Sequence, residues 1–307
     1  MGGGTLPSWQ RANGEALVDL LFGGIVTGIL VGGVYALMAS GLTLVFGVMD
    51  IINVAQGALV ILGAYLSYAL QQHLHIDPFL SLVITIPAMF LIGIAIEFVA
   101  VRRIRANRTM LSILVTFAVA LIIEGVLTML FSPNLVEIHA WYVDKSFLVG
   151  SVYVPYIYLF GFLLSIVLLF ALYVYLYRTK FGRAIRATVQ NRTAAELIGI
   201  NVNRVDTVTF GIGVSLAATG GMVYGALNTF NPNSAYDLIS RLLAIIILGG
   251  MGSLSGALVA ALAMMVIENV TSLYAPVWEA VVFYLILAIV LLIRPQGIFG
   301  RVATRRQ

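Results

Sequence analysis

The chain has 307 residues, of which 61% are hydrophobic and only 10% charged, and its formal net charge is +4. This number of charged residues is too small to cover the surface of a soluble domain. The composition therefore indicates a membrane protein. Cysteine is absent, which excludes a disulfide framework and a thiolate metal site, and the three histidines form no HExxH pattern. We therefore expect no metal and no cofactor.

The N-terminal residues 1–16 are rich in glycine and polar residues, and we expect them to form a tail. No basic region precedes an apolar one here, so the pattern does not predict a cleavable signal peptide. The first apolar stretch, 17–39, is long enough to span a membrane and would itself act as the insertion signal.

The next stretch, 41–70, is apolar at both ends but is interrupted by Asp50, Asn53 and Gln56. Broken helices at membrane depth are tolerated only where protein or a water-filled path covers the freed backbone groups. We therefore predict a broken or re-entrant helix over 41–70 and place these three side chains on a substrate pathway.

Four spans of about 20 residues are predicted next, over 78–101, 109–131, 154–177 and 207–230. Charged groups inside such spans tend to face a cavity or a partner. Glu124 lies deep in the second of these spans and has no obvious partner near it in sequence, so it is a further pathway candidate. Glu97 lies about one helical turn from Arg102, which favours simple pairing.

A second broken stretch, 241–274, is interrupted by four glycines at 249, 250, 252 and 256 and is followed by a last span over 276–293. We expect a re-entrant hairpin or two short helices that turn at 249–256. Gly249, Gly250 and Gly252 would let a substrate approach the backbone, although small residues also let membrane helices pack closely. The chain is thus predicted to be an all-α polytopic membrane protein, with about 8 transmembrane segments in a single domain over 17–294 and a cytoplasmic tail over 295–307.

Most of the 17 Lys and Arg residues fall in three places, 102–108, 178–204 and 294–306. The positive-inside rule places all three in the cytoplasm, where they also contact membrane lipid. A basic patch can indicate nucleic acid, but topology already explains the charge of so apolar a chain, and we expect no nucleic-acid partner. The stretches 71–77, 132–153 and 231–240 should face outward, so 17–70 and 241–274 must each end outside. The side on which the N-terminus lies stays open.

The longest hydrophilic segment is the cytoplasmic loop 178–206. Gly182 and Gly199 bracket about four helical turns, with Arg183, Arg186 and Gln190 on one face. Ile185 and Val189 lie on another face. This pattern predicts a short amphipathic helix on the membrane surface, which would be either a simple connector or a docking helix for a cytoplasmic partner.

Several runs resemble one known family, in the right order along nearly the whole chain. Residues 181–187, Asn191 and 194–200 are similar to the cytoplasmic loop of branched-chain amino acid ABC transporter permeases of the LivH/LivM type. Residues 35–65 resemble the N-terminal half of LivH in particular, 248–257 the late Gly-rich segment of the family, and 294–297 its C-terminal end. One departure lies at 54–58, where Val, Ala, Gln, Gly and Ala replace the aromatic, Ala, His, Gly and acidic residues usual in the family.

The resemblance implies a transport subunit, not an enzyme, in the bacterial cytoplasmic (inner) membrane. It would translocate branched-chain or related amino acids delivered by an external substrate-binding protein, together with a second, related permease and two cytoplasmic ATP-binding subunits. The residues expected to couple it to the ATPases are Gly182, Arg183, Arg186, Asn191, Glu196 and Gly199. The chain has only two lysines, Lys145 and Lys180, and neither lies in a GxxxxGK[ST] motif, so ATP hydrolysis is expected on a partner.

Two other readings compete with the importer. A self-sufficient secondary transporter or channel for a small polar solute would use broken helices and buried carboxylates equally well. An intramembrane enzyme is disfavoured, because the sequence has no cysteine, no histidine within a span, and no nucleophile and base at a helical spacing.

Overall fold

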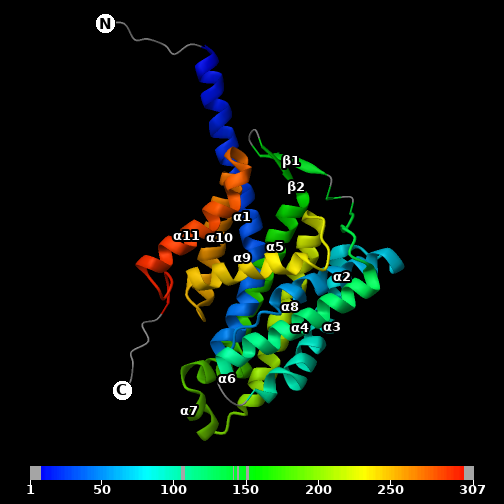
Figure 1. Ribbon diagram of the computed structural model, residues 1–307, viewed down its shortest axis with the longest axis vertical. Helices are drawn as coiled ribbons and strands as arrows, with labels where there is room; N and C mark the ends of the chain where they lie inside the picture. Colours follow the sequence, from blue (N-terminus) through cyan, green and yellow to red (C-terminus); the bar gives the residue numbers. More distant parts are fainter. Residues whose placement is uncertain (1–7, 105–107, 141, 144, 150–151, 301–307) are drawn as a thin grey trace.

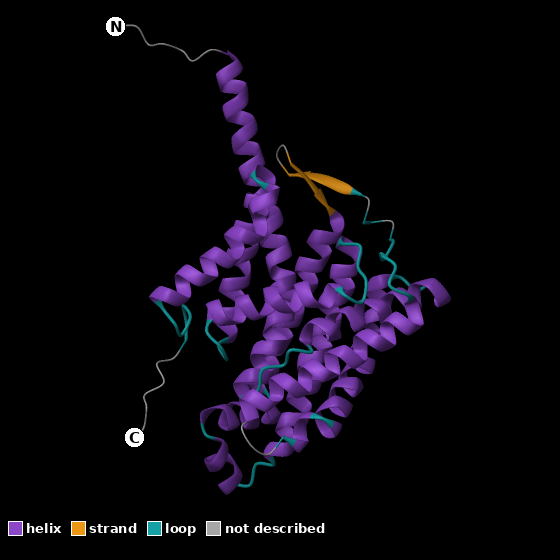
Figure 2. Ribbon diagram, viewed as in Figure 1, coloured by secondary structure: helices purple, strands orange, loops and turns teal. Residues whose placement is uncertain are grey.

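A computed structural model describes residues 8–104, 108–140, 142–143, 145–149 and 152–300 (Figures 1 and 2). Two antiparallel strands, β1 (Ser146–Val149) and β2 (Val152–Pro155), are joined to a helical bundle. The helices are α1 (Ser8–Met49), α2 (Gln56–Leu74), α3 (Pro78–Val99), α4 (Arg108–Phe131), α5 (Tyr156–Arg178), α6 (Lys180–Gln190), α7 (Arg192–Leu197), α8 (Val202–Leu227), α9 (Ser234–Gly249), α10 (Leu254–Tyr274) and α11 (Glu279–Ile293), with 3-10 turns at Val101–Arg103 and Pro276–Trp278.

Seven of the described helices are long and apolar enough to cross a membrane. They are α1, α3, α4, α5, α8, α10 and, with the 3-10 turn before it, α11. The prediction of an all-α polytopic membrane protein is therefore confirmed. The shorter helices α2 and α9 come from the two broken stretches, and each lies within the bundle (Figure 1).

The first predicted break lies at residues 50–55, between α1 and α2. Residues 41–49 continue α1 without interruption, and α1 begins at Ser8, inside the segment expected to be a tail. Gly41 lies within this helix and lets α8 approach closely, since a Cβ there would lie 2.5 Å from the carbonyl oxygen of Gly213 in α8. The helix ends where Asp50 adopts a positive φ of 55°, which is uncommon for a residue other than glycine.

The second break is a hairpin of α9 and α10, and its turn lies at the predicted glycines. Gly250 and Gly252 have φ values of 93° and 82°, a region that favours glycine. Ser253 then caps α10, because its hydroxyl accepts a hydrogen bond from the Gly256 N–H at 3.1 Å. α9 begins at Ser234, so part of the expected outward connection 231–240 is helical.

α1 packs antiparallel to α10 through glycines spaced four residues apart. Gly24 faces Leu273 and Val270, and Gly32 faces Leu262. Between them, a Cβ on Gly28 would lie only 2.5 Å from the Val266 Cα. Small residues at this spacing let the two backbones approach closely, as is common between membrane helices.

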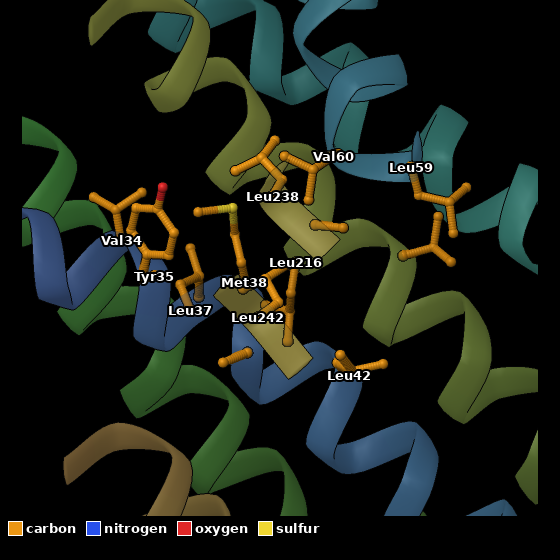
Figure 3. Packing of buried hydrophobic residues seen from close by; sticks show 14 of the residues in the cluster. Val34, Tyr35, Leu37, Met38, Leu42, Leu59, Val60, Leu216, Leu238 and Leu242 are labelled. Atoms are coloured by element: carbon orange, nitrogen blue, oxygen red, sulfur yellow. The ribbon is translucent and has the colours of Figure 1, made fainter. Parts of the chain in front are cut away.

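α8 lies at the centre of the bundle and is largely buried. Around it, one apolar core joins α1, α2, α8 and α9; Figure 3 shows residues from each, including Met38, Leu59, Leu216 and Leu242. α4 and α11, in contrast, bury only 11% and 6% of their most apolar segments. Their exposed apolar faces suit contact with lipid or with another subunit.

The two breaks lie near the same end of the bundle as the basic loops. The 250–253 turn approaches the end of α1, where Gly47 faces Gly252, and it also contacts Gly300 after α11. α6 and α7 lie at the end of the molecule far from the start of α1, whereas β1 and β2 lie near that start (Figure 1). The segment 102–108 is described only in part, and Arg105, Arg301, Arg305, Arg306 and Asp144 lie outside the described residues.

Candidate functional site

The break between α1 and α2 is satisfied by hydroxyl groups of α4. The Ile52 N–H donates to Ser112 Oγ at 3.2 Å, and the Val54 N–H donates to Thr116 Oγ1 at 3.0 Å. Both hydroxyls are fully buried. The backbone groups that a helix break would leave unpaired at membrane depth are therefore partly paired within the protein.

The three polar side chains predicted in this break do not lie together. Asn53 and Gln56 are fully buried, and Asn53 Nδ2 donates to Gln56 Oε1 at 3.1 Å. Gln56 Nε2 in turn donates to the carbonyl oxygen of Gly213 in α8 at 3.4 Å. Asp50 is exposed, and its carbonyl accepts a hydrogen bond from Thr109 of α4 at 3.2 Å. The break thus joins α1 and α2 to both α4 and α8.

The glycines of the second break allow backbone segments to meet. A Cβ on Gly249 would lie 2.5 Å from the carbonyl carbon of Gly256, and one on Gly250 would lie 2.4 Å from the Gly300 nitrogen. Gly252 has a positive φ and lies beside Gly47. These contacts favour the packing alternative that the sequence left open for Gly249 and Gly250.

Glu124 of α4 has a partner that is distant in sequence. The Tyr236 hydroxyl of α9 donates to Glu124 Oε2 at 2.5 Å. The two residues are 112 positions apart, so no local pattern could have predicted the pair. This hydrogen bond links the start of the α9–α10 hairpin to α4.

A cluster of charges that was not predicted from the sequence lies in the part of the α9–α10 hairpin away from its turn. Arg241 of α9 forms ion pairs with Glu268 of α10, with Asp237 one turn earlier at 3.2 Å, and with Glu279 of α11 at 3.8 Å. The sequence did contain a signal for this cluster, because Arg241 is an isolated cation inside an apolar stretch and should need a partner there. Its three partners come from three helices and could not be assigned from spacing.

This cluster borders a cavity of about 140 Å³. The cavity lies among α1, α5, α8, α9, α10 and α11, and its polar lining comprises Tyr35, Tyr158, Tyr224, Asn228, Arg241, Glu268, Asn269, Ser272 and Glu279. Asn228 and Glu279 stand at helix ends. The cavity therefore lies near the end of the bundle opposite α6 and α7.

The loop 178–206 forms two helices, so the prediction of a single helix between Gly182 and Gly199 is wrong. The chain breaks at Asn191, whose Oδ1 accepts a hydrogen bond from the Ala194 N–H at 3.0 Å and caps α7. Asparagine favours this position because its side chain competes with the helical backbone bond. Gly199, with a φ of 86°, ends the pair.

α6 packs against the end of α5. Gly182 is required there, because a Cβ would lie 2.3 Å from the Tyr175 carbonyl oxygen. The Arg186 guanidinium lies 4.5 Å from the centre of the Tyr177 ring, a cation–π distance. Arg183 is exposed and Ile185 is buried, as the amphipathic pattern predicts. Val189, expected on the same buried face as Ile185, is instead 46% exposed, so this part of the prediction is wrong.

One buried carboxylate of α8 binds two arginines, one from this loop and one from α4. Arg192 of α7 binds Asp206 with both terminal nitrogens, at 3.2 and 2.6 Å, and Arg108 of α4 adds a contact at 3.5 Å. The Asp206 side chain is only 2% exposed. At the next residue, the Thr207 hydroxyl donates to Glu97 of α3 at 2.7 Å. Glu97 is therefore held by α8, and among the described residues it forms no ion pair with Arg102, so the predicted pairing is wrong.

The far end of α7 presents an apolar tip. Leu197 and Ile198 are 84% and 75% exposed, and Glu196 beside them is also exposed. This apolar pair is therefore available for contact with another protein.

At the opposite end, Tyr142 fastens the segment before β1 to the start of α3. Its hydroxyl donates to Asp77 Oδ1 at 3.1 Å, and Asp77 also caps α3. Burial, and then the neighbouring Asp77 carboxylate, raise the pKa of the Tyr142 phenol above its usual range. This contact therefore depends on a neutral phenol.

Comparison with known proteins gives a consistent result. Residues 24–292 match the family model of the permease component of branched-chain amino acid transport systems. The chain is 28% identical to the high-affinity branched-chain amino acid permease protein BraD of Pseudomonas aeruginosa, over 90% of this chain and 95% of that protein. It is 28% identical to LivH of Escherichia coli (89% of this chain, 94% of that protein) and 29% identical to a probable LivH of Methanocaldococcus jannaschii (89% and 90%). No solved structure matches the chain significantly.

Proposed function

The chain belongs to the branched-chain amino acid transport permease family, and from that premise we propose that it is the membrane-spanning subunit of an ABC importer for branched-chain or related amino acids. It works in the bacterial cytoplasmic membrane with a second permease, two cytoplasmic ATPases and an external substrate-binding protein. We assign ATP hydrolysis to the two ATPase subunits.

The observation that carries the proposal is the anchored apolar tip of α7. Leu197 and Ile198 are exposed, while Arg192 ties the same short helix to the buried Asp206 of α8. Movement of a partner docked on the tip is therefore transmitted to the central helix of the bundle. An ATPase needs such a connection in order to switch the bundle, as a rigid body, between a state open to the outside and a state open to the inside.

The positive-inside rule sets the orientation of the bundle in the membrane. It puts α6, α7 and the two breaks on the cytoplasmic side, and the start of α1 and the Arg241 cluster on the outer side. We assign the inner part of the pathway to the region of Asp50, Asn53 and Gln56 and to the 249–252 turn, because both breaks interrupt helices at that end. Gly249 and Gly250 would shape this part by letting backbone segments pack closely, not by contacting the substrate. Glu124 borders the outer part through Tyr236.

The coupling role falls to both helices of the loop. Gly182 and Asn191 set the geometry of α6 and α7 by close packing and capping. Arg183, Arg186, Glu196 and Gly199 complete the surface around the apolar tip. An ATPase that carries an apolar groove with polar edges would fit it.

Co-purification from native membranes tests this function. With the wild-type chain in mild detergent, we expect an ATPase and a second permease to co-purify and L-leucine uptake to require the Walker lysine of that ATPase. Leu197→Asp should lower both ATPase recovery and uptake at least about tenfold, since it buries a charge at the contact. Leu135→Asp, at an exposed apolar residue of the outer side, is the matched control. Gradient-driven flux through the chain alone would instead establish a secondary transporter or channel.

A further inference from the structure

We propose that the cavity beside Arg241 is a binding site for the ammonium group of an α-amino acid on the outer half of the pathway. The inference rests on the proposed transport function and narrows its substrate class. A zwitterionic amino acid carries the ammonium that this site recognises, whereas urea and other neutral amides do not. The branched-chain amino acids of the relatives fall within this class.

The first argument is the charge around the cavity. Arg241 contacts three carboxylates, those of Asp237, Glu268 and Glu279. One guanidinium therefore faces three acids, and the cluster has an excess of formal negative charge. Charges within a membrane domain are costly and tend to be retained where they meet an ion or substrate. A positively charged group in the cavity would balance part of this excess.

The second argument is an unsatisfied carboxylate oxygen. Glu268 is only 5% exposed, and its Oε1 pairs with Arg241, whereas its Oε2 is buried and accepts no hydrogen bond. A buried acceptor without a donor costs about 1–3 kcal/mol or more. Glu279, also on the cavity wall, has a loose contact of 3.8 Å with Arg241. Both acids can therefore still accept hydrogen bonds from a ligand.

The third argument is the shape and composition of the cavity. Its volume of about 140 Å³ is enough for several water molecules or a small ligand, since one water needs only about 10–15 Å³ measured in this way. Val31, Val34, Leu227 and Met265 add an apolar wall. Within the described part of the chain, no group of three His, Asp or Glu side chains is arranged to hold a metal ion. An ammonium group with an attached apolar side chain fits this lining better than a metal.

The lack of cysteine in the natural chain permits a direct test of the charge. Ser272 lines the cavity and Ser132 is exposed near the same end of the bundle, so Ser272→Cys reports on the site and Ser132→Cys is its matched control. Each variant, in the assembled complex, is treated with a cationic trimethylammonium-ethyl or an anionic sulfonatoethyl methanethiosulfonate. Mass spectrometry of this chain measures the two rates.

We expect the ratio of cationic to anionic modification rates to be at least about tenfold higher at Ser272→Cys than at Ser132→Cys, because a charged cleft concentrates counter-ions to that extent. Adding Glu268→Gln should remove most of this difference. Because that change leaves Arg241 with one partner fewer and can impair folding, Glu279→Gln is tested in parallel and should reduce the ratio as well. Equal ratios at the two cysteines would overturn the proposal.

Ligand protection tests the ammonium group itself. L-leucine and 3-methylbutylamine should slow modification of Ser272→Cys severalfold, and 4-methylpentanamide, which lacks the ammonium group, should not. Equal protection by the amide, or none by L-leucine, would overturn the site. If leucine uptake requires the ATPase but L-leucine does not slow modification of Ser272→Cys, the transport function is supported and this site is refuted. Protection without any ATP-driven uptake would refute the transport function instead.

Discussion

Asp206→Asn tests how the cytoplasmic loop is joined to the bundle. The change keeps the shape of the side chain but removes the charge that holds Arg192 and Arg108. Breaking a fully buried ion pair costs about 3–5 kcal/mol, and breaking an exposed one costs about 0–1. Asp206 is 2% exposed, while its two partners are 31% and 30% exposed. We therefore expect an intermediate loss of about 2 kcal/mol in the free energy that docks α7 onto α8.

A loss of that size changes an equilibrium constant by roughly thirtyfold. Hydrogen exchange followed by mass spectrometry measures this change: the α7 amides should exchange faster than in the wild type, by up to about thirtyfold. α8 amides beyond the first two turns should exchange as in the wild type, because their burial does not depend on Asp206. Leucine uptake should fall, and ATP hydrolysis in the complex should fall less, since docking would persist without transmission.

The matched control is Arg183→Ala, which removes an exposed charge from α6 in the same loop. It should leave exchange in α7 unchanged. The paired exchange Asp206→Arg with Arg192→Asp should restore part of the protection. Wild-type exchange of α7 in the Asp206→Asn protein would refute the anchoring role of this ion pair.

Three further predictions concern other contacts. Gly250→Ala should lower the thermal midpoint of unfolding in detergent by several degrees, because Gly250 has a φ of 93° and a Cβ there would meet the backbone of Gly300. Gly125→Ala, a position with open space around it, should leave the midpoint unchanged. Gln56→Leu should cost about 1–3 kcal/mol in denaturant unfolding, because it leaves Asn53 without its buried acceptor; unchanged stability would contradict this. The raised pKa of Tyr142 means that its stabilising contribution is present below the ordinary phenol pKa of about 10 and is lost as pH rises through the higher folded value. Protection factors near Asp77, corrected for the intrinsic pH dependence of amide exchange, should thus fall at alkaline pH in the wild type and not in Tyr142→Phe.

The positions of most helices followed from the sequence because they depend on local composition. Runs of about 20 apolar residues must be helical in a membrane, where every backbone group needs an internal partner, and α3, α4, α5, α8 and α11 lie close to the predicted ranges. The two breaks were also visible, as polar and glycine residues within apolar runs. The exact end of α1 was not, because Gly41 lies within the helix against α8 and the helix ends only at Asp50, which adopts a positive φ.

The loop 178–206 shows the same division. Its charge, its amphipathic pattern and its family resemblance are properties of the sequence. Its separation into α6 and α7 depends on whether Asn191 caps a new helix or continues the old one, and these alternatives differ by only about 1 kcal/mol. The contact of Arg192 with Asp206 then fixes the second helix on α8.

Sequence alone therefore determined the class of the protein, its spans, its breaks and its family, because hydrophobic length and charge distribution act locally. Only the tertiary structure decided which buried polar groups meet. Glu124 accepts a hydrogen bond from Tyr236, and Arg241 forms ion pairs with acidic residues of α9, α10 and α11. Such pairs form between helices far apart in the chain, where burial in a medium of low dielectric makes a partner necessary, and the spacing of residues along one helix carries no information about which partner that is.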